Sequence, residues 1–189
     1  MPDMRIRRAA PADLPVLTRL WQAAFGDPPE LSERFYRRFP PAKAAWVVEA
    51  GGCVVTAAHL LEGRLHTADG GVLPCAYVYA VSTDPAHQGN GYASALMRRF
   101  AMDADVSGRV LYTLPAEGSL YKWYQEVMGT TQTARGERIR IARQQTAGTL
   151  PSVTRISAPE YAVLRAQQLQ GQTYAEPSAA LMDFQADLC

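Results

Sequence analysis

A glycine-containing loop near the middle of the chain combines residue types and a spacing that suit anion binding. It reads Gln88-Gly89-Asn90-Gly91-Tyr92-Ala93-Ser94, with an apolar segment on each side. Glycines let a backbone approach an anion closely, and the amides at a helix N-terminus favour negative charge. The pattern therefore predicts a phosphate-binding connection between a strand and a helix.

Other interpretations of the same loop fit less well. A P-loop needs a lysine and a serine or threonine after its second glycine, and neither is present. A dinucleotide fingerprint needs a third glycine where Ser94 stands, and it belongs directly after the first strand of the fold. A plain connection, with glycines serving only the turn, stays open as the structural alternative.

The spacing Gln88-x-x-Gly91-x-Ala93 resembles the Q/R-x-x-G-x-G/A signature of the GCN5-related N-acetyltransferase (GNAT) family. The segments VSTDP at 81–85 and ALM at 95–97 resemble the same family. The resemblance implies that the anion is the diphosphate of acetyl-CoA, that the pantetheine arm follows the preceding strand, and that no metal is required. The implied donor contacts are the main chain of Val81 and Thr83, together with Gln88, Gly89, Asn90, Gly91, Tyr92, Ala93 and Ser94.

A second segment, WYQEVMG at residues 123–129, resembles the FYEKLGF-type helix of this family. In that pattern the second residue, here Tyr124, is the general acid that protonates the departing CoA thiolate. A phenol suits this role because it stays protonated until the thiolate forms. Tyr121 is the alternative acid, and a core position with a satisfied hydroxyl is the structural alternative for Tyr124. Thr130 stands where the family usually has phenylalanine.

The base that would receive the proton of the amine is less defined. Residues 76–83, the predicted central strand, contain no carboxylate. Glu117, just beyond the next predicted strand, is the first candidate and would act through water, while Tyr79, His59 and Glu49 are the others. A partly neutral amine would need only a water relay. No GxSxG elbow is present, and neither Cys53 nor Cys75 has a histidine nearby in the sequence, which favours direct attack over an acyl-enzyme.

These segments require a mixed α/β arrangement to position them. Hydrophobic periodicity predicts strands over residues 4–9, 44–50, 53–61, 76–83, 109–114, 130–134 and 138–143. It predicts helices over residues 11–25, 31–39, 92–106 and 118–128. The family resemblance, which extends from residue 4 to about 143, implies the GNAT fold: a central mixed, mostly antiparallel twisted sheet, flanked by helices and splayed at the acetyl-CoA site.

The chain of 189 residues suits one domain with a short appendage. We expect residues 1–146 to form the GNAT domain and residues 147–189 to form a linker and a helical C-terminal extension. Ser157 and Glu160 predict a capping box that opens a helix. The extension resembles the start of the second half of enhanced-intracellular-survival-type acetyltransferases. A final amphipathic helix would pack on the domain or on a second subunit, which would make a homodimer.

Composition excludes several classes of function. The net charge of +1 gives no bulk attraction to nucleic acid or to anionic membranes. The three cysteines are far apart and predict neither a disulfide framework nor a zinc site. No apolar run approaches the roughly 20 residues of a membrane span. We expect a reduced, soluble, cytoplasmic protein that binds no metal.

The acceptor site is expected at the loop over residues 26–32 and at the turn near Arg135-Gly136. Asp27 and Glu30 in this loop would suit a cationic amine, although acids on loops are as a rule simply solvated. The predicted activity is transfer of an acetyl group from acetyl-CoA to a primary amine of a small molecule or peptide, by direct attack in a ternary complex. The alternative is a non-catalytic acyl-CoA-binding module that senses the cofactor or regulates a partner.

Overall fold

The structure is a computed structural model that describes residues 4–132 and 154–188. Within these residues, six strands form one sheet in the order β1-β2-β3-β4-β5, and β6 pairs with β3. All pairs are antiparallel except the parallel pair β4–β5. The strands are β1 (Met4–Arg8), β2 (Ala45–Ala50), β3 (Cys53–His66), β4 (Val72–Thr83), β5 (Val110–Tyr112) and β6 (Tyr174–Pro177).

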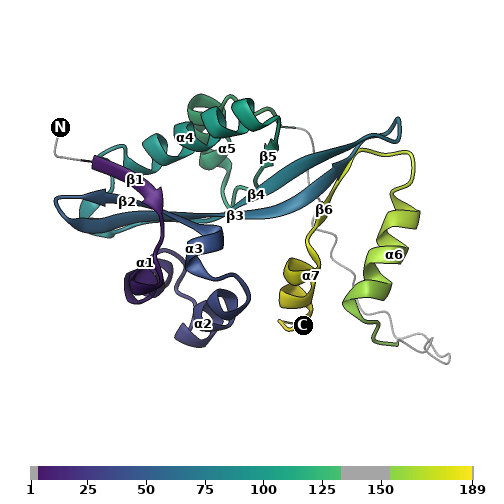
Figure 1. The fold of residues 1–189 in the computed structure, drawn as a ribbon, viewed down its shortest axis with the longest axis horizontal. Helices are drawn as coiled ribbons and strands as arrows, with labels where there is room; N and C mark the ends of the chain where they lie inside the picture. Colours follow the sequence, from purple (N-terminus) through teal and green to yellow (C-terminus); the bar gives the residue numbers. More distant parts are fainter. Residues whose placement is uncertain (1–3, 133–153, 189) are drawn as a thin grey trace, which may run out of the picture.

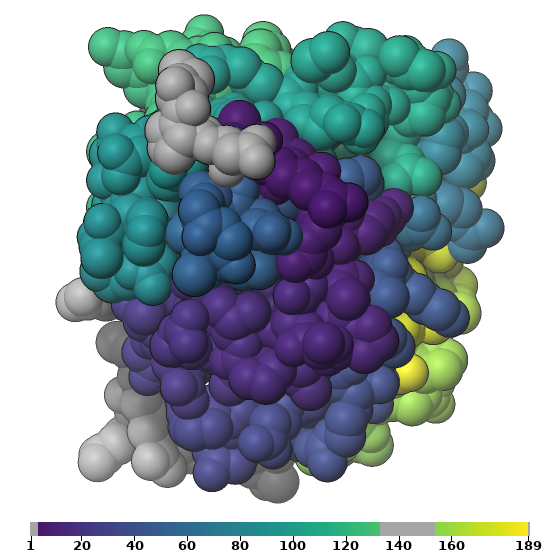
Figure 2. All heavy atoms as spheres, turned by 60° about the vertical axis from the view of Figure 1, so that its left-hand side comes forward, coloured from purple at the N-terminus to yellow at the C-terminus, as the bar shows by residue number. Residues whose placement is uncertain are grey.

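Helices cover both faces of the sheet (Figure 1). One face carries α4 and α5, and the other carries α1, α2 and α3. Figure 2 shows the edge at β1, where β1 itself lies between these two layers. The helices are α1 (Leu14–Phe25), α2 (Pro29–Arg38), α3 (Pro41–Ala44), α4 (Tyr92–Ser107), α5 (Gly118–Met128), α6 (Ala158–Gln168) and α7 (Ala179–Ala186).

The central strands are apolar on both faces because each face has its own core. Val47 and Val48 are adjacent in β2 and fully buried, yet they belong to different clusters. Val47 packs with the core of α1 and α2, which includes Trp21 and Phe35, and Val48 packs with the α4 core, which includes Phe100. Successive side chains of a strand point to opposite faces, so both layers are needed to bury them.

The predicted mixed α/β architecture is confirmed, and the strand predicted as central, β4, is an interior strand between β3 and β5. Two strands are longer than predicted, since β3 continues to His66 and β4 begins at Val72. The predicted strand over 138–143 and the domain boundary at 146/147 lie outside the described residues. Of the strand predicted over 130–134, residues 130–132 are described and are not in a strand, and the last two residues lie outside the described residues. The helix predicted after Ser157 is α6, and Ser157 and Glu160 form the capping box.

The C-terminal segment contributes a strand that the sequence did not predict. β2 pairs with β3 only as far as His59, which leaves the same edge of β3 unoccupied beyond that residue. β6 takes this edge, from Gly63 opposite Pro177 to His66 opposite Tyr174. A Cβ atom on Gly63 would lie 2.6 Å from the Glu176 carbonyl oxygen, so only glycine permits this approach.

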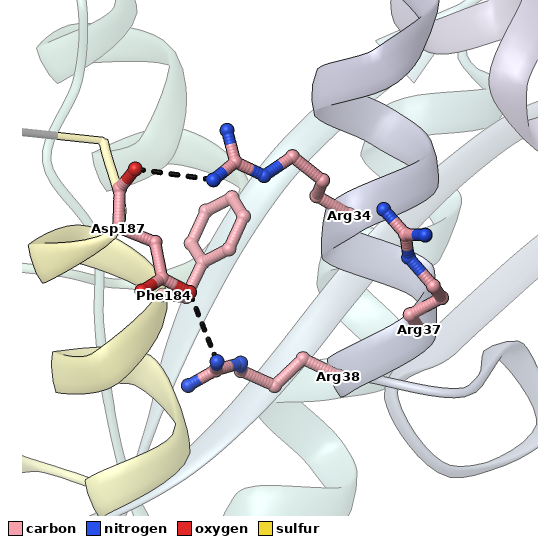
Figure 3. A pocket seen from close by; sticks show the side chains of 5 residues that line it. All are labelled: Arg34, Arg37, Arg38, Phe184 and Asp187. Carbon is pink, nitrogen blue, oxygen red and sulfur yellow. Dashed lines mark hydrogen bonds and ion pairs between the residues drawn. The ribbon is translucent and has the colours of Figure 1, made fainter.

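The last helix packs on the domain itself. Phe184 of α7 is buried and meets Phe35 of α2 edge-on, with ring centroids 5.5 Å apart. Arg34 and Arg38 reach from α2 to Asp187 at the end of α7 (Figure 3). Arg34 donates to its carbonyl oxygen at 3.2 Å and Arg38 to its carboxylate at 2.9 Å. The apolar face predicted for this segment is therefore covered within one chain.

Candidate active site

The sheet opens where β4 and β5 separate. β5 pairs with β4 only between Cys75 and Tyr77, whereas β4 continues to Thr83. Thr113, just after β5, donates its hydroxyl to the Val78 carbonyl at 3.1 Å. Within the described part of the chain, residues 79–83 have no strand partner on this edge. The predicted splaying of the sheet is confirmed, and it leaves backbone hydrogen-bonding groups open to a ligand.

A bulge in β4 lies at this opening. Ala57 pairs with Ser82 and His59 pairs with Tyr79, so one residue of β3 opposes two residues of β4. Ala80 within the bulge has φ of 47°, a left-handed conformation that costs a residue with a side chain about 1–3 kcal/mol. Such bulges re-aim the backbone and are frequent beside active sites. Sequence reasoning did not predict it, because alanine carries no signal for positive φ.

His59 holds this bulge from the protein interior. The ring is buried, and burial lowers the pKa of His59 to about 4, so it is neutral near pH 7. A carbonyl can only accept, so the contact of 3.2 Å assigns the proton to Nδ1, which donates to the Tyr79 oxygen. Nε2 then accepts from the Tyr36 hydroxyl at 3.0 Å. With both nitrogens engaged, His59 is suited to positioning rather than to catalysis as a base.

The predicted phosphate loop connects β4 to α4. Gly89 and Gly91 have φ of 78° and 77°, a conformation that favours glycine. Gly91 is the N-cap of α4, and no side chain caps this helix end. The first amides of the helix, at Tyr92, Ala93 and Ser94, have no intrahelical acceptor. The structure therefore forms an amide-lined helix N-terminus where the sequence predicted one.

The polar side chains of the loop turn onto its own backbone. Asn90 Nδ2 donates to the carbonyls of His87 at 3.0 Å and Gln88 at 3.3 Å. Gln88 Nε2 lies 3.4 Å from the Thr83 carbonyl. These bonds brace the loop. The side chains of Asn90 and Gln88 therefore stabilise the turn, and no side chain caps the helix that follows.

Tyr124 lies on the other side of the opening. It is buried, and burial raises the pKa of its phenol, with a hydrogen bond to Thr113 partly opposing that effect. Its neighbour Trp123 donates to Ser94 Oγ at 3.1 Å. Because Ser94 belongs to the first turn of α4, this bond ties the helix of Tyr124 directly to the loop. The two motifs that the sequence singled out are thus brought together.

A cavity of about 210 Å³ lies at the opening between the two strands. It is lined by residues from α1 and the loop after it, from β4, from the segment after β5, and from α5. Trp21, Asp27, Tyr79 and Tyr124 are among them. A larger cavity of about 370 Å³ lies between α2 and α7, where Arg34 and Arg38 already bind Asp187 (Figure 3). We place the candidate site in the smaller cavity, because it adjoins the open strand edge and contains a buried phenol.

The other residues predicted as acids or bases lie elsewhere. Glu117 is the N-cap residue of α5, is exposed, and does not line the cavity. Tyr121 is 42% exposed and does not line it either. Glu49 forms an ion pair of 2.9 Å with Arg7. Tyr79 does line the cavity, and burial raises the pKa of its phenol.

Sequence reasoning missed Tyr77 and Thr113 among the residues of the cavity. Tyr77 is two positions before Tyr79, so strand periodicity could have placed both on one face. Within the described ranges, no group of three or more His, Cys, Asp or Glu side chains could hold a metal ion. No helix in these ranges is long and apolar enough to span a membrane.

Comparison with known families agrees with this geometry. The profile described as "Acetyltransferase (GNAT) domain" matches residues 5–126, well over half of the chain. The protein belongs to the GNAT family. The matched residues include β4, the predicted phosphate loop and most of α5.

Solved structures share the GNAT fold. A probable N-acyltransferase from Enterococcus faecalis V583 is 20% identical, with a TM-score of 0.56 over 65% of this chain and 32% of that chain. Eis1 from Mycobacterium abscessus is 20% identical, with a TM-score of 0.53 over 64% and 30%. The aminoglycoside N-acetyltransferase AAC(6')-Iy, in complex with CoA, is 15% identical, with a TM-score of 0.58 over 77% and 97%.

At these identities the likeness shows the fold alone. The chain spans about a third of the length of the first of these structures. No curated protein matches the sequence.

Proposed function

We propose that this GNAT protein transfers an acetyl group from acetyl-CoA to a primary amine of a small molecule or peptide. One observation carries the proposal: the open edge of β4 lies between an amide-lined helix N-terminus and a buried phenol. The first suits a diphosphate, the second suits a departing thiolate, and the open edge between them suits the pantetheine arm. The aminoglycoside acetyltransferase, whose structure contains CoA, supports this choice of donor.

The donor side uses main-chain groups. The amides from Gly89 to Ser94 bind the diphosphate at the N-terminus of α4, where the helix dipole favours negative charge. Val81 and Thr83 offer their open main-chain groups to the pantetheine amides. An amide of the bulge, near Ala80, polarises the thioester carbonyl and stabilises the negative charge that develops on its oxygen.

The chemical step is a direct attack in a ternary complex. The neutral amine forms a bond from nitrogen to the acetyl carbon, and the bond from this carbon to sulfur breaks. The phenol of Tyr124 gives its proton to the CoA thiolate as it departs. The raised pKa of Tyr124 fits this order of events, because the phenol stays protonated until the thiolate forms. The proton of the amine leaves to water, with Glu117 as the candidate base that receives it from there.

Turnover of acetyl-CoA with a panel of amines tests the proposal. Release of the CoA thiol, measured with a thiol reagent, should require both the protein and an amine, and the amide product should appear in equal amount. CoA binding is measured in parallel by calorimetry. Binding of CoA without thiol release for any amine would instead support a non-catalytic acyl-CoA-binding module. Absence of both binding and release would reject the site.

A further inference from the structure

We propose that Asp27 selects the acceptor: its carboxylate binds the ammonium group of an arriving amine with an apolar skeleton and no carboxylate beside the amino group. The bound ammonium group loses one proton to water before its nitrogen attacks the acetyl carbon. The inference rests on the proposed function for the identity of the site. It adds a substrate class and a specificity-determining residue, neither of which follows from membership of the family.

The end of α1 directs Asp27 into the cavity. Gly26 adopts a left-handed conformation with φ of 69°, and its amide donates to the Gln22 carbonyl at 2.9 Å, which ends the helix. The chain turns there, and Asp27 lines the cavity with Tyr124 and with residues 77–81 of β4. Glu30, the other acid of this loop, is exposed and does not line it.

The carboxylate of Asp27 is oriented but not neutralised. Its Oδ2 atom accepts a hydrogen bond of 2.8 Å from Nε1 of Trp21, a side chain that is only 3% exposed. Within the described part of the chain, Oδ1 has no hydrogen-bond partner and the carboxylate forms no ion pair. A half-buried carboxylate without a counter-ion is costly, and an ammonium group would stabilise it.

The other walls also favour a cation with an apolar body. Among the described residues that line the cavity, Asp27 is the one with a charged side chain. Aromatic rings from α1, β4 and α5 line the same cavity as Asp27. The faces of such rings attract cations. The negative charge of Asp27 acts on Tyr79 in the same cavity: burial raises the pKa of Tyr79, and this charge raises it further. The aromatic residues are Trp21, Phe25, Tyr77, Tyr79 and Tyr124.

The same charge disfavours amino acids as acceptors. A carboxylate next to the amino group would lie close to Asp27, and juxtaposed like charges cost several kcal/mol in binding. Alkylamines and arylalkylamines carry no such group. A matched pair of probes follows: 2-phenylethylamine and L-phenylalanine differ only in the carboxylate.

The experiment compares the wild type with Asp27→Asn and Glu30→Gln. Asn keeps an oxygen that can accept from Trp21 but removes the charge, and Glu30→Gln removes the same charge from the same loop outside the cavity. For 2-phenylethylamine, Asp27→Asn should lower kcat/KM by about 10- to 100-fold, mainly through KM. The KM for acetyl-CoA should stay within about 2-fold. Glu30→Gln should behave as the wild type.

A binding measurement separates this inference from the proposed function. Calorimetry of 2-phenylethylamine against the protein saturated with CoA should show the same 10- to 100-fold loss in Asp27→Asn, and L-phenylalanine should bind the wild type more weakly than 2-phenylethylamine. If the amine binds in this pattern but no thiol is released, the inference stands and the proposed activity fails. Equal binding to wild type and Asp27→Asn, no binding of the amine at all, or preference for L-phenylalanine would overturn the inference.

Discussion

The long hairpin of β3 and β4 has two halves that differ in how their edges are covered. In the far half, β6 pairs with residues 63–66 of β3, and β5 pairs with residues 75–77 of β4. In the near half, residues 79–83 of β4 face no strand on the outer edge among the described residues. The same two strands therefore have edges that are partly covered by other strands at one end and an open edge of β4 at the other.

The charged and aromatic side chains of the two halves also differ in whether they have partners. In the far half, Glu176 of β6 accepts from Arg64 at 2.9 Å and from His66 at 2.5 Å, and the ring of His66 stacks on Tyr174. In the near half, Asp27 has no counter-ion among the described residues, although it lies beside aromatic rings of β4. In the far half these charged and aromatic side chains are paired, whereas in the half that we assign to function the carboxylate of Asp27 has no counter-ion among the described residues.

Removing the phenol hydroxyl of Tyr124 should have the largest effect on activity and therefore tests this division most strongly. Tyr124→Phe removes the proposed proton donor without changing the size of the side chain much, so kcat should fall by about 100- to 1000-fold. CoA affinity should stay within about 2-fold, because the loop is untouched. Steady-state turnover and calorimetry measure the two quantities. An unchanged kcat would show that Tyr124 is not the general acid. Tyr121→Phe, on the same helix, is the matched comparison, because Tyr121 is the alternative acid.

Substitution in the predicted phosphate loop should give the next largest effect. Gly91→Asp places a negative charge and a side chain at the N-cap of α4, where φ is 77°, so CoA affinity should fall about 100-fold. Gly108→Asp is the matched control, because Gly108 ends the same helix with φ of 63°. It should leave CoA binding unchanged. Equal affinities of both variants and wild type, measured by calorimetry, would reject the loop as the diphosphate site.

Buried His59, which contacts the bulge in β4, should make the stability of the protein depend on pH. The pKa of His59 is about 4 in the folded protein, below the ordinary value of about 6.5 expected in the unfolded chain. The unfolded chain therefore binds an extra proton between these values. Stability is complete above about pH 6.5 and is lost as the pH falls towards 4. Lowering the pH from 7 to 5 should cost about 2 kcal/mol.

Urea unfolding at several pH values measures this loss. His59→Gln should flatten the dependence whatever its effect on absolute stability, while His87→Gln, at a more exposed histidine of the phosphate loop, should retain it. If His59→Gln keeps the full dependence, other groups cause it. The bulge would then not depend on a neutral histidine.

The far half should respond to substitution without affecting ligand binding. Gly63→Ala forces its Cβ against the Glu176 carbonyl, which should cost about 1–2 kcal/mol and speed amide exchange in β6. CoA affinity should not change. Gly118→Ala is the control, since a Cβ there meets nothing within 4 Å. A Gly63→Ala variant that weakens CoA binding as strongly as Gly91→Asp would contradict the division of the hairpin.

The glycine-containing turn before α4 and the helix of Tyr124 could be predicted because their signals are local in the sequence. Gly89 and Gly91 are two residues apart and lie at the start of a helix with clear periodicity, and Tyr124 lies in a short family-like segment. The sequence also predicts that the loop over residues 26–32 contributes to the acceptor site, but the full set of residues around the cavity could not be predicted in the same way. Its residues come from three separate parts of the chain, and only folding brings Asp27 beside β4.

The misses have physical reasons of the same kind. β6 is four residues long and ends in Pro177, so it exists only because β3 offers it an edge. The extension of β4 contains Pro74, which argues against a strand when the sequence is considered alone. Glu117 was favoured as a base by its nearness in sequence to the next motif. The structure places it at an exposed helix start, and its role stays a prediction.

The pairing of β6 with β3 also sets an order for how the chain reaches its folded state. Residues 66 and 176 are 110 positions apart, so their contact closes a long loop and forms late. During synthesis, β3 presents a bare strand edge until the ribosome has released residues 174–177, and bare edges recruit other chains. Expression of a fragment cut near residue 146 would make that state permanent. The yield of such a fragment should therefore depend on temperature and on chaperones far more than the yield of the full chain.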